Sequence, residues 1–139
     1  MRPPNKGILL IDYQRYWREI AARALRSADF LVCPVDSYNY YLALECLQWE
    51  NPDLVVLGCT RIGLEEQSLI TQVLAHKHHL LVICAFLPWQ VMRSLFVQGV
   101  DDIVDKTYDP AHLIDIVNKT LASIVPRNSY QAVEREGVA

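Results

Sequence analysis

Short apolar runs alternate with longer amphipathic segments along most of the chain, and this alternation restricts the possible folds more than any other feature. A short apolar run is typical of a buried strand, whereas apolar residues spaced three and four apart form one face of a helix. The repeated pattern predicts five strand–helix units, (βα)₅, and therefore an α/β protein with a doubly wound, five-stranded parallel sheet. The predicted strands are residues 7–12, 30–35, 53–57, 80–84 and 103–105, and the predicted helices are residues 13–27, 38–49, 64–76, 88–98 and 109–126.

Residues that favour helix ends support several of these boundaries. Ser37 is a candidate cap for the second helix, because its hydroxyl can accept a free backbone N–H. That helix is expected to end before Pro52, since the residue preceding a proline avoids helical geometry. Gly99 can adopt the left-handed conformation that closes a helix, and Asp109 can cap the start of the last one.

The length of the chain predicts a single domain. With 139 residues, 52% of them hydrophobic, it can build one packed core but not two. Pro126 is expected to end the last helix, because proline lacks the N–H that continues helical hydrogen bonding. Beyond it the apolar periodicity stops, which predicts a domain at residues 1–126 and a mobile tail at residues 127–139.

Charge and hydropathy limit where in the cell the protein is expected and which kinds of partner it is expected to bind. The longest apolar runs fall well short of the roughly 20 residues that span a bilayer, and Asp12 interrupts the first of them, so neither a membrane segment nor a signal peptide is predicted. We therefore expect a cytoplasmic protein with no membrane partner. The net charge of −3 gives no reason to expect nucleic acid as a partner.

The four cysteines, at positions 33, 46, 59 and 84, are predicted to be reduced core residues. They lie far apart in apolar surroundings, unlike the cysteines of a disulfide scaffold or a zinc site. Cys59 and Cys84 follow neighbouring strands, so a redox-sensitive pair is an alternative, although a small buried hydrophobe is the more common role of cysteine.

Three stretches resemble the most recognisable parts of response-regulator receiver domains of the CheY-like type. They are residues 8–12 (ILLID), 51–57 (NPDLVVL) and 99–106 (GVDDIVDK), in the order of that family, and the resemblance extends over about residues 6–125. It implies a flavodoxin-like receiver fold and a role in two-component signal transduction, in which phosphorelay between proteins is usual. In a doubly wound sheet the site then lies at the carboxyl ends of the strands.

The chain departs from this family at the residues that carry its chemistry. The resemblance implies two adjacent acids after the first strand, which hold Mg²⁺, and an aspartate after the third strand, which accepts a phosphoryl group. Asp12 matches the first acid, but Tyr13 replaces the second, and a phenol is a poor ligand for Mg²⁺. Gly58 stands at the phosphoacceptor position and offers no nucleophile. We therefore expect no aspartyl phosphorylation, weak or absent Mg²⁺ binding and no other cofactor.

Further positions of the implied site are also changed. Cys84 replaces the family's hydroxyl residue after the fourth strand, and Ile103 replaces the aromatic residue that acts as its switch. Lys106 matches the family's lysine, so an ion pair with Asp12 across the altered site is expected, exposed enough to contribute only about 0–1 kcal/mol. The residues assigned to this vestigial receiver site are Asp12, Tyr13, Gly58, Thr60, Cys84 and Lys106.

Two other clusters carry weaker signals. His76, His78 and His79 are interpreted as a solvated loop, because no acid or cysteine lies nearby in the sequence to complete a metal site. Apolar residues on the fourth helix exceed what a core-facing stripe needs. Because that helix, with the fifth strand and fifth helix, forms the dimerisation and output face of the family, an interface is a candidate there, and its residues are Trp89, Met92 and Phe96.

These observations predict a non-catalytic signalling module, a pseudo-receiver, that acts by protein–protein contact without aspartyl phosphorylation. Its partner would be a histidine kinase, another regulator or a second copy of the chain. The common nucleotide-binding and hydrolase motifs are absent, which agrees with a protein that is not an enzyme. The alternative is a small-molecule or thiol-redox sensor that uses the space left by the missing carboxylate.

Overall fold

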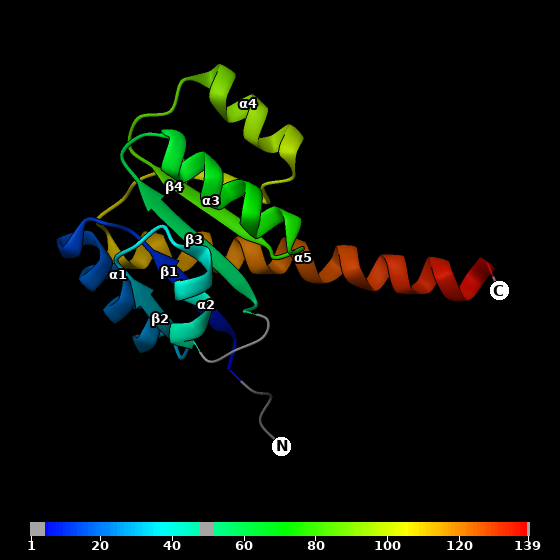
Figure 1. The fold of residues 1–139 in the computed structure, drawn as a ribbon. Coiled ribbons are helices and arrows are strands. Elements are labelled where there is room, and N and C mark those ends of the chain that lie inside the picture. Colours follow the sequence, from blue (N-terminus) through cyan, green and yellow to red (C-terminus); the bar gives the residue numbers. More distant parts are fainter. Residues whose placement is uncertain (1–4, 48–51, 139) are drawn as a thin grey trace.

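The computed structural model describes the backbone of residues 5–47 and 52–138 and the side chains of residues 5–46 and 52–124. Strands and helices alternate along the chain as the sequence predicts (Figure 1). The strands are β1 (Gly7–Ile11), β2 (Leu31–Val35), β3 (Leu54–Cys59), β4 (Leu80–Cys84) and β5 (Asp102–Asp105), and the helices are α1 (Arg15–Ser27), α2 (Tyr40–Leu47), α3 (Leu64–Ala75), α4 (Trp89–Gln98) and α5 (Pro110–Val138).

All neighbouring strands pair in parallel, in the order β2-β1-β3-β4-β5. Because the strands are parallel, the carboxyl ends of β1, β3 and β4 lie together at one edge of the sheet. The strand order reverses direction at β1, which lies between β2 and β3. This confirms the predicted doubly wound α/β fold. A ligand or partner site in such a sheet is expected at that edge, beside the point of reversal.

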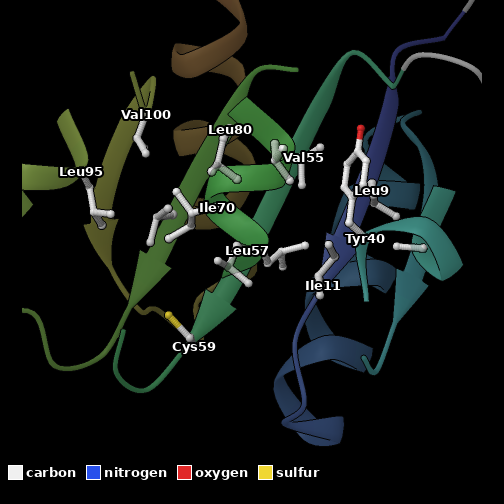
Figure 2. Close-up of a cluster of buried hydrophobic side chains, with 14 of the residues drawn as sticks. Leu9, Ile11, Tyr40, Val55, Leu57, Cys59, Ile70, Leu80, Leu95 and Val100 are labelled. Carbon is white, nitrogen blue, oxygen red and sulfur yellow. The ribbon is translucent and has the colours of Figure 1, made fainter. Parts of the chain in front are cut away.

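The three central strands, β1, β3 and β4, are buried on both faces, as their unbroken apolar sequences predict, whereas the edge strands β2 and β5 are partly exposed. Successive strand residues point to opposite faces, so Ile8 and Leu10 pack beneath α1 and α5, whereas Leu9 and Ile11 pack beneath α2 and α3. Figure 2 shows the second of these two layers, in which Leu9 and Ile11 lie beside the ring of Tyr40. Each fully buried aliphatic side chain stabilises the fold by about 1.5–3 kcal/mol.

Strand β3 is longer than predicted. The sequence places its end at Leu57, but the ladder continues because Gly58 lies opposite Ile83 and Cys59 lies opposite Cys84. Gly58 is therefore a buried strand residue rather than the first residue of a loop. This difference matters because it fixes the direction in which any side chain at position 58 would point.

The start of α2 also differs from the prediction. Ser37 does not cap the helix, because its hydroxyl accepts the N–H of Asn39 at 3.2 Å, one residue before the helix begins. Asn39 is the cap instead, since its side-chain oxygen accepts the N–H of Leu42 at 3.0 Å. The predicted end of this helix, before Pro52, falls among residues 48–51 and lies outside the described part of the chain.

The caps predicted for the last two helices are confirmed. Gly99 follows α4 with a φ of 112°, the left-handed conformation that glycine adopts without a steric penalty. At the start of α5, the Asp109 carboxylate accepts the N–H of Ala111 at 3.1 Å. These two caps could be predicted from the sequence because each depends on only a few neighbouring residues.

The predicted end of α5 is wrong. The helix passes through Pro126 and reaches Val138, so it projects well beyond the sheet (Figure 1). Proline removes only its own N–H bond, a cost of about 3 kcal/mol, and the helical hydrogen bonds on either side can still form. Whether the segment after Pro126 is mobile, as the sequence suggests, remains a prediction. No helix in the described part of the chain is both long and apolar enough to cross a membrane.

Candidate functional site

Asp12 and Lys106 meet at the carboxyl ends of the strands, across the end of β3. Lys106 Nζ lies 2.7 Å from Asp12 Oδ2, and the two side chains are only 4% and 2% exposed, respectively. The second oxygen of Asp12 accepts the N–H of Gln14 at 2.7 Å. Among the described residues, neither Lys106 Nζ nor Asp12 Oδ2 has another hydrogen-bond partner. The expected ion pair is therefore present but far more buried than expected, so its two charges depend on each other.

Trp17 fills the space beside Gly58. A methyl group placed on Gly58 would lie 2.3 Å from Asp12 Oδ2 and 2.7 Å from the Trp17 ring, distances that real side chains do not tolerate. The indole is 1% exposed, and its Nε1 donates to the carbonyl of Thr107 at 2.7 Å. Lys106 Nζ lies 4.9 Å from the centre of the indole ring, within the range of a cation–π interaction. The region that accepts a phosphoryl group in the resembling family is thus closed by packed side chains.

Sequence reasoning missed this role of Trp17. The periodicity of residues 13–27 assigns Trp17 to the buried face of the helix, which is correct, but it does not show that the ring reaches the ends of β3 and β5. One signal was available. The resemblance puts a carboxylate where this chain has Gly58, and a large aromatic residue, Trp17, stands near the start of the helix that follows the first strand. The volume lost at one position could therefore have been matched to the volume added at the other.

Tyr13 points away from Asp12 and Lys106, toward α2 and α3. Its ring centre lies 4.1 Å from that of Tyr38, and its hydroxyl donates to Glu65 at 3.1 Å. Partial desolvation and the hydrogen bond to Glu65 raise the pKa of Tyr13, so its phenol stays neutral near pH 7. The structure therefore separates Tyr13 from the rest of the vestigial site.

The side chains of Thr60 and Cys84 do not join the Asp12–Lys106 pair, although the resemblance assigns both residues to the same site. Thr60 is exposed and takes part through its carbonyl, which lies 3.4 Å from Cys84 Sγ and accepts the N–H of Phe86 at 2.8 Å. Cys84 lies on the opposite face of the sheet from Trp17, in the layer beneath α3 and α4. Neither side chain approaches the Asp12–Lys106 pair closely enough to form a hydrogen bond or ion pair with it.

The two strand-end cysteines lie on neighbouring positions of the sheet. Cys59 and Cys84 are register partners in β3 and β4, and both are buried. A hydrogen bond from Cys59 lowers the pKa of Cys84 to about 7, and the same bond raises the pKa of Cys59. Burial of Cys84 opposes this lowering of its pKa, whereas a backbone hydrogen bond at Phe86 adds to it. Burial of both thiols confirms the prediction that they are core residues. The same prediction is wrong for Cys46, which is exposed, and holds only in part for Cys33, which is partly buried.

The switch position and the candidate interface on α4 lie together. Ile103 is buried and lines a cavity of about 330 Å³ together with Cys84 and Met92. Met92 packs partly against the core, whereas Trp89 and Phe96 are exposed, and Leu95 is the buried residue of this helix. The three residues predicted as an interface are therefore not equivalent, because Met92 faces inward.

The histidine cluster is only partly the solvated loop that the sequence suggests. His78 is buried, with its ring centre 5.7 Å from that of Tyr40, so that interpretation is wrong for this residue. Burial lowers the pKa of His78 and favours its neutral form. In the region that the structure describes, no group of three or more His, Cys, Asp and Glu side chains is arranged to hold a metal ion.

Comparisons with known proteins identify the fold. No protein-family model matches the sequence, and no curated protein matches it. Solved structures do match. A response regulator from Thermotoga maritima aligns over 85% of this chain and 98% of its own, with a TM-score of 0.70 and 20% identity.

Two further matches also cover most of both chains at low sequence identity. A CheY-like receiver domain protein from Methanospirillum hungatei JF-1 aligns over 86% of this chain and 95% of its own, with a TM-score of 0.73 and 14% identity. The chemotaxis response regulator CheY4 of Vibrio cholerae aligns over 84% and 98%, with a TM-score of 0.68 and 13% identity. The chain thus has the fold of these receiver domains.

Proposed function

We propose that this chain is a pseudo-receiver, a signalling module that acts by protein–protein contact without aspartyl phosphorylation and without catalysis. The observation that carries the proposal is the replacement of the acceptor side chain by Gly58 together with the closure of the adjacent space by Trp17. Absence of the acceptor alone could leave an open pocket for another ligand. Closure by a buried indole favours a role for the module's surface instead.

Three physical effects oppose phosphoryl chemistry at this site. Gly58 has no nucleophile to attack a phosphoryl donor. The space next to it is filled, so neither a phosphoryl group nor a hydrated Mg²⁺ ion has room without displacement of Trp17. Lys106 and Asp12 already neutralise each other at 2.7 Å, so the site offers little net charge to attract either ion.

A set of contacts between α1 and the β5–α5 loop supports a single fixed conformation. Trp17 Nε1 bonds the Thr107 carbonyl, and the hydroxyl of Tyr108 donates to the side chain of Gln14 at 3.1 Å. The ring centres of Tyr16 and Tyr108 lie 6.2 Å apart. These contacts join the loop to the start of α1 through the chain's own side chains, so the module would present one surface to its partner at all times.

The partner is proposed to be a protein of a signalling pathway, such as a histidine kinase or another regulator. The face formed by α4, β5 and α5 is a candidate for this contact or for a homodimer, because Trp89 and Phe96 are exposed there. No cofactor is needed for such a role.

The proposal is tested by exposing the purified chain to Mg²⁺ and then to beryllofluoride, a mimic of an acyl phosphate, while amide NMR spectra are recorded. Intact mass is measured after incubation with acetyl phosphate. We expect no saturable shifts near Asp12, Gly58 and Lys106 and no added phosphoryl mass. A receiver domain that retains its acceptor aspartate serves as the positive control. Saturable shifts at these residues, or a phosphoryl adduct, would overturn the proposal.

The second candidate function is a thiol-redox sensor, because Cys59 and Cys84 lie side by side in the sheet. It predicts that mild oxidation of the folded chain removes two hydrogens from the pair and that the Cys84→Ser variant prevents this mass change. The pseudo-receiver proposal predicts no reaction of either thiol in the folded chain, since both are buried. The small-molecule form of this alternative has less support, because Trp17 occupies the space next to Gly58.

A further inference from the structure

A groove lined by tyrosines lies beside the closed site, between α2 and the start of α3. It has a volume of about 540 Å³, and its aromatic walls include Tyr13, Tyr38 and Tyr41. Tyr13 and Tyr41 are 53% and 65% exposed, so part of each ring is open to a ligand. Exposed tyrosines that flank one groove are more informative than scattered surface hydrophobes, because together they form a continuous binding surface.

The charge of this groove is negative. Glu65 is the one charged residue in its lining, and among the described side chains no Lys or Arg lines it. The Glu65 carboxylate is held in place by the hydroxyl of Tyr13 at 3.1 Å. The charge of Glu66 also acts on Tyr13 and Tyr38, which shows that a second carboxylate lies close to the rings.

The aromatic walls are positioned by contacts that do not involve a ligand. Tyr38 donates its hydroxyl to the carbonyl of Gly58 at 3.2 Å, and its ring lies against that of Tyr13. The residue that replaces the second acid of the receiver family is thus fixed as one wall of the groove. A binding surface that is already ordered loses less conformational entropy when a ligand binds.

We propose that this groove binds an arginine side chain of an extended segment of a partner protein. A guanidinium group can stack on a tyrosine face and pair with a carboxylate in the same pose, because it is planar and carries several N–H donors. Ser37, Asn39, Ser68 and Gln72 also line the groove and can bond the backbone of the bound segment. The proposal rests on the proposed function, since it names the partner chemistry of a module that acts by protein contact.

A second groove supplies an internal contrast. It lies between α1 and α2 and has a volume of about 620 Å³, and its charged lining residues are Arg18, Arg23, Arg26, Glu19 and Asp36. Its cations outnumber its carboxylates, so its net positive charge repels the guanidinium group that Glu65 would attract. An arginine ligand should therefore bind in the tyrosine groove and not in the second groove. A general affinity for peptides would not discriminate between the two grooves in this way.

The first arm of the test titrates ¹⁵N-labelled protein with N-acetyl-arginine amide and with its neutral analogue, N-acetyl-citrulline amide. We expect saturable shifts around Tyr13, Tyr41 and Glu65, with the arginine compound binding about fivefold or more tightly than the citrulline compound at low salt. Glu65→Gln should reduce this preference below about twofold. Tyr41→Phe should keep it, and Tyr41→Ala should weaken binding severalfold, because only the second removes the ring face.

The second arm compares hexapeptide mixtures that differ only in a fixed central residue, which is Arg, Lys, Gln or Glu. Arginine mixtures should bind most tightly, and Glu65→Gln should abolish the ranking. Binding of the free arginine compound without a peptide preference, shifts that map to α4, or a preference that survives Glu65→Gln would overturn the proposal. These outcomes would leave the proposed function standing, because that depends on the response to beryllofluoride, which the same spectra record separately.

Discussion

The carboxyl ends of β1, β3 and β5 and the helix α4 differ sharply in how they are packed. At the strand ends, Asp12, Trp17 and Lys106 are buried and held by an ion pair and a hydrogen bond. On α4, Leu95 is buried, whereas Trp89 is 62% exposed and contacts the guanidinium group of Arg93. The strand ends, where the resemblance implies the site of receiver chemistry, are here part of the core, whereas α4 keeps exposed surface.

This contrast indicates which part of the molecule can form new contacts without a loss of core packing. A packed and neutralised site has no empty volume or unbalanced charge with which to detect an ion. A helix held by few buried side chains can change its contacts when a partner binds, since little core packing is lost. Substitutions at both regions test whether the strand ends and α4 differ in this way.

The largest loss of stability is expected from Lys106→Met. It leaves the Asp12 carboxylate buried without its cation, and the loss of one partner from a buried pair costs about 3–5 kcal/mol of unfolding free energy. Urea denaturation measures the change. The double variant Asp12→Asn with Lys106→Met removes both charges and should recover much of the loss. A single variant as stable as the parent would mean that the pair is solvated rather than part of the core.

A smaller loss of stability is expected from Gly58→Ala. The added methyl group would collide with Asp12 and Trp17, and such overpacking costs about 1–3 kcal/mol. Thermal and urea unfolding should show this loss, and Trp17→Val should reduce it because the two changes act on the same space. Gly63→Ala is the matched control, since its methyl group meets only the flexible Glu66 side chain and should cost under about 1 kcal/mol. Equal effects at both glycines would contradict a closed site.

Trp17→Phe should destabilise the protein by about 1–2 kcal/mol. The smaller ring keeps most of the apolar contact but loses the N–H that bonds the Thr107 carbonyl. Hydrogen exchange at Thr107 and Tyr108 should accelerate more than exchange in β4. Acceleration spread evenly over the sheet would show that Trp17 stabilises the core in general and not the β5–α5 loop.

The smallest effect on stability is expected from Trp89→Ala. An exposed side chain without core contacts contributes no more than about 0.5 kcal/mol, so the urea midpoint should barely move. If α4 is an interface, the same variant should weaken self-association or partner binding, measured by sedimentation and by pull-down with the intact chain as the control. A large loss of stability would show that α4 is packed as tightly as the strand ends.

Much of the fold was predictable from the sequence because the signals are local. A strand buried on both faces is unbroken in its hydrophobicity, and a helix repeats its apolar residues every three or four positions. Gly99 and Asp109 act through their own backbone and nearest neighbours, so they too could be identified. The absence of a nucleophile at Gly58 follows from the resemblance and needs no coordinates.

Tertiary structure alone decided how the altered site is filled and where its residues point. Trp17, Lys106 and Thr107 come from two separate parts of the chain, and no periodicity shows that an indole reaches a carbonyl 90 residues away. The outward turn of Tyr13 depends on the Tyr38 ring and the Glu65 carboxylate, which the loop before α2 and the start of α3 bring to it. Helical and strand patterns arise from short-range geometry, whereas the packing of volume and the pairing of buried charge depend on contacts between segments that only the folded chain brings together.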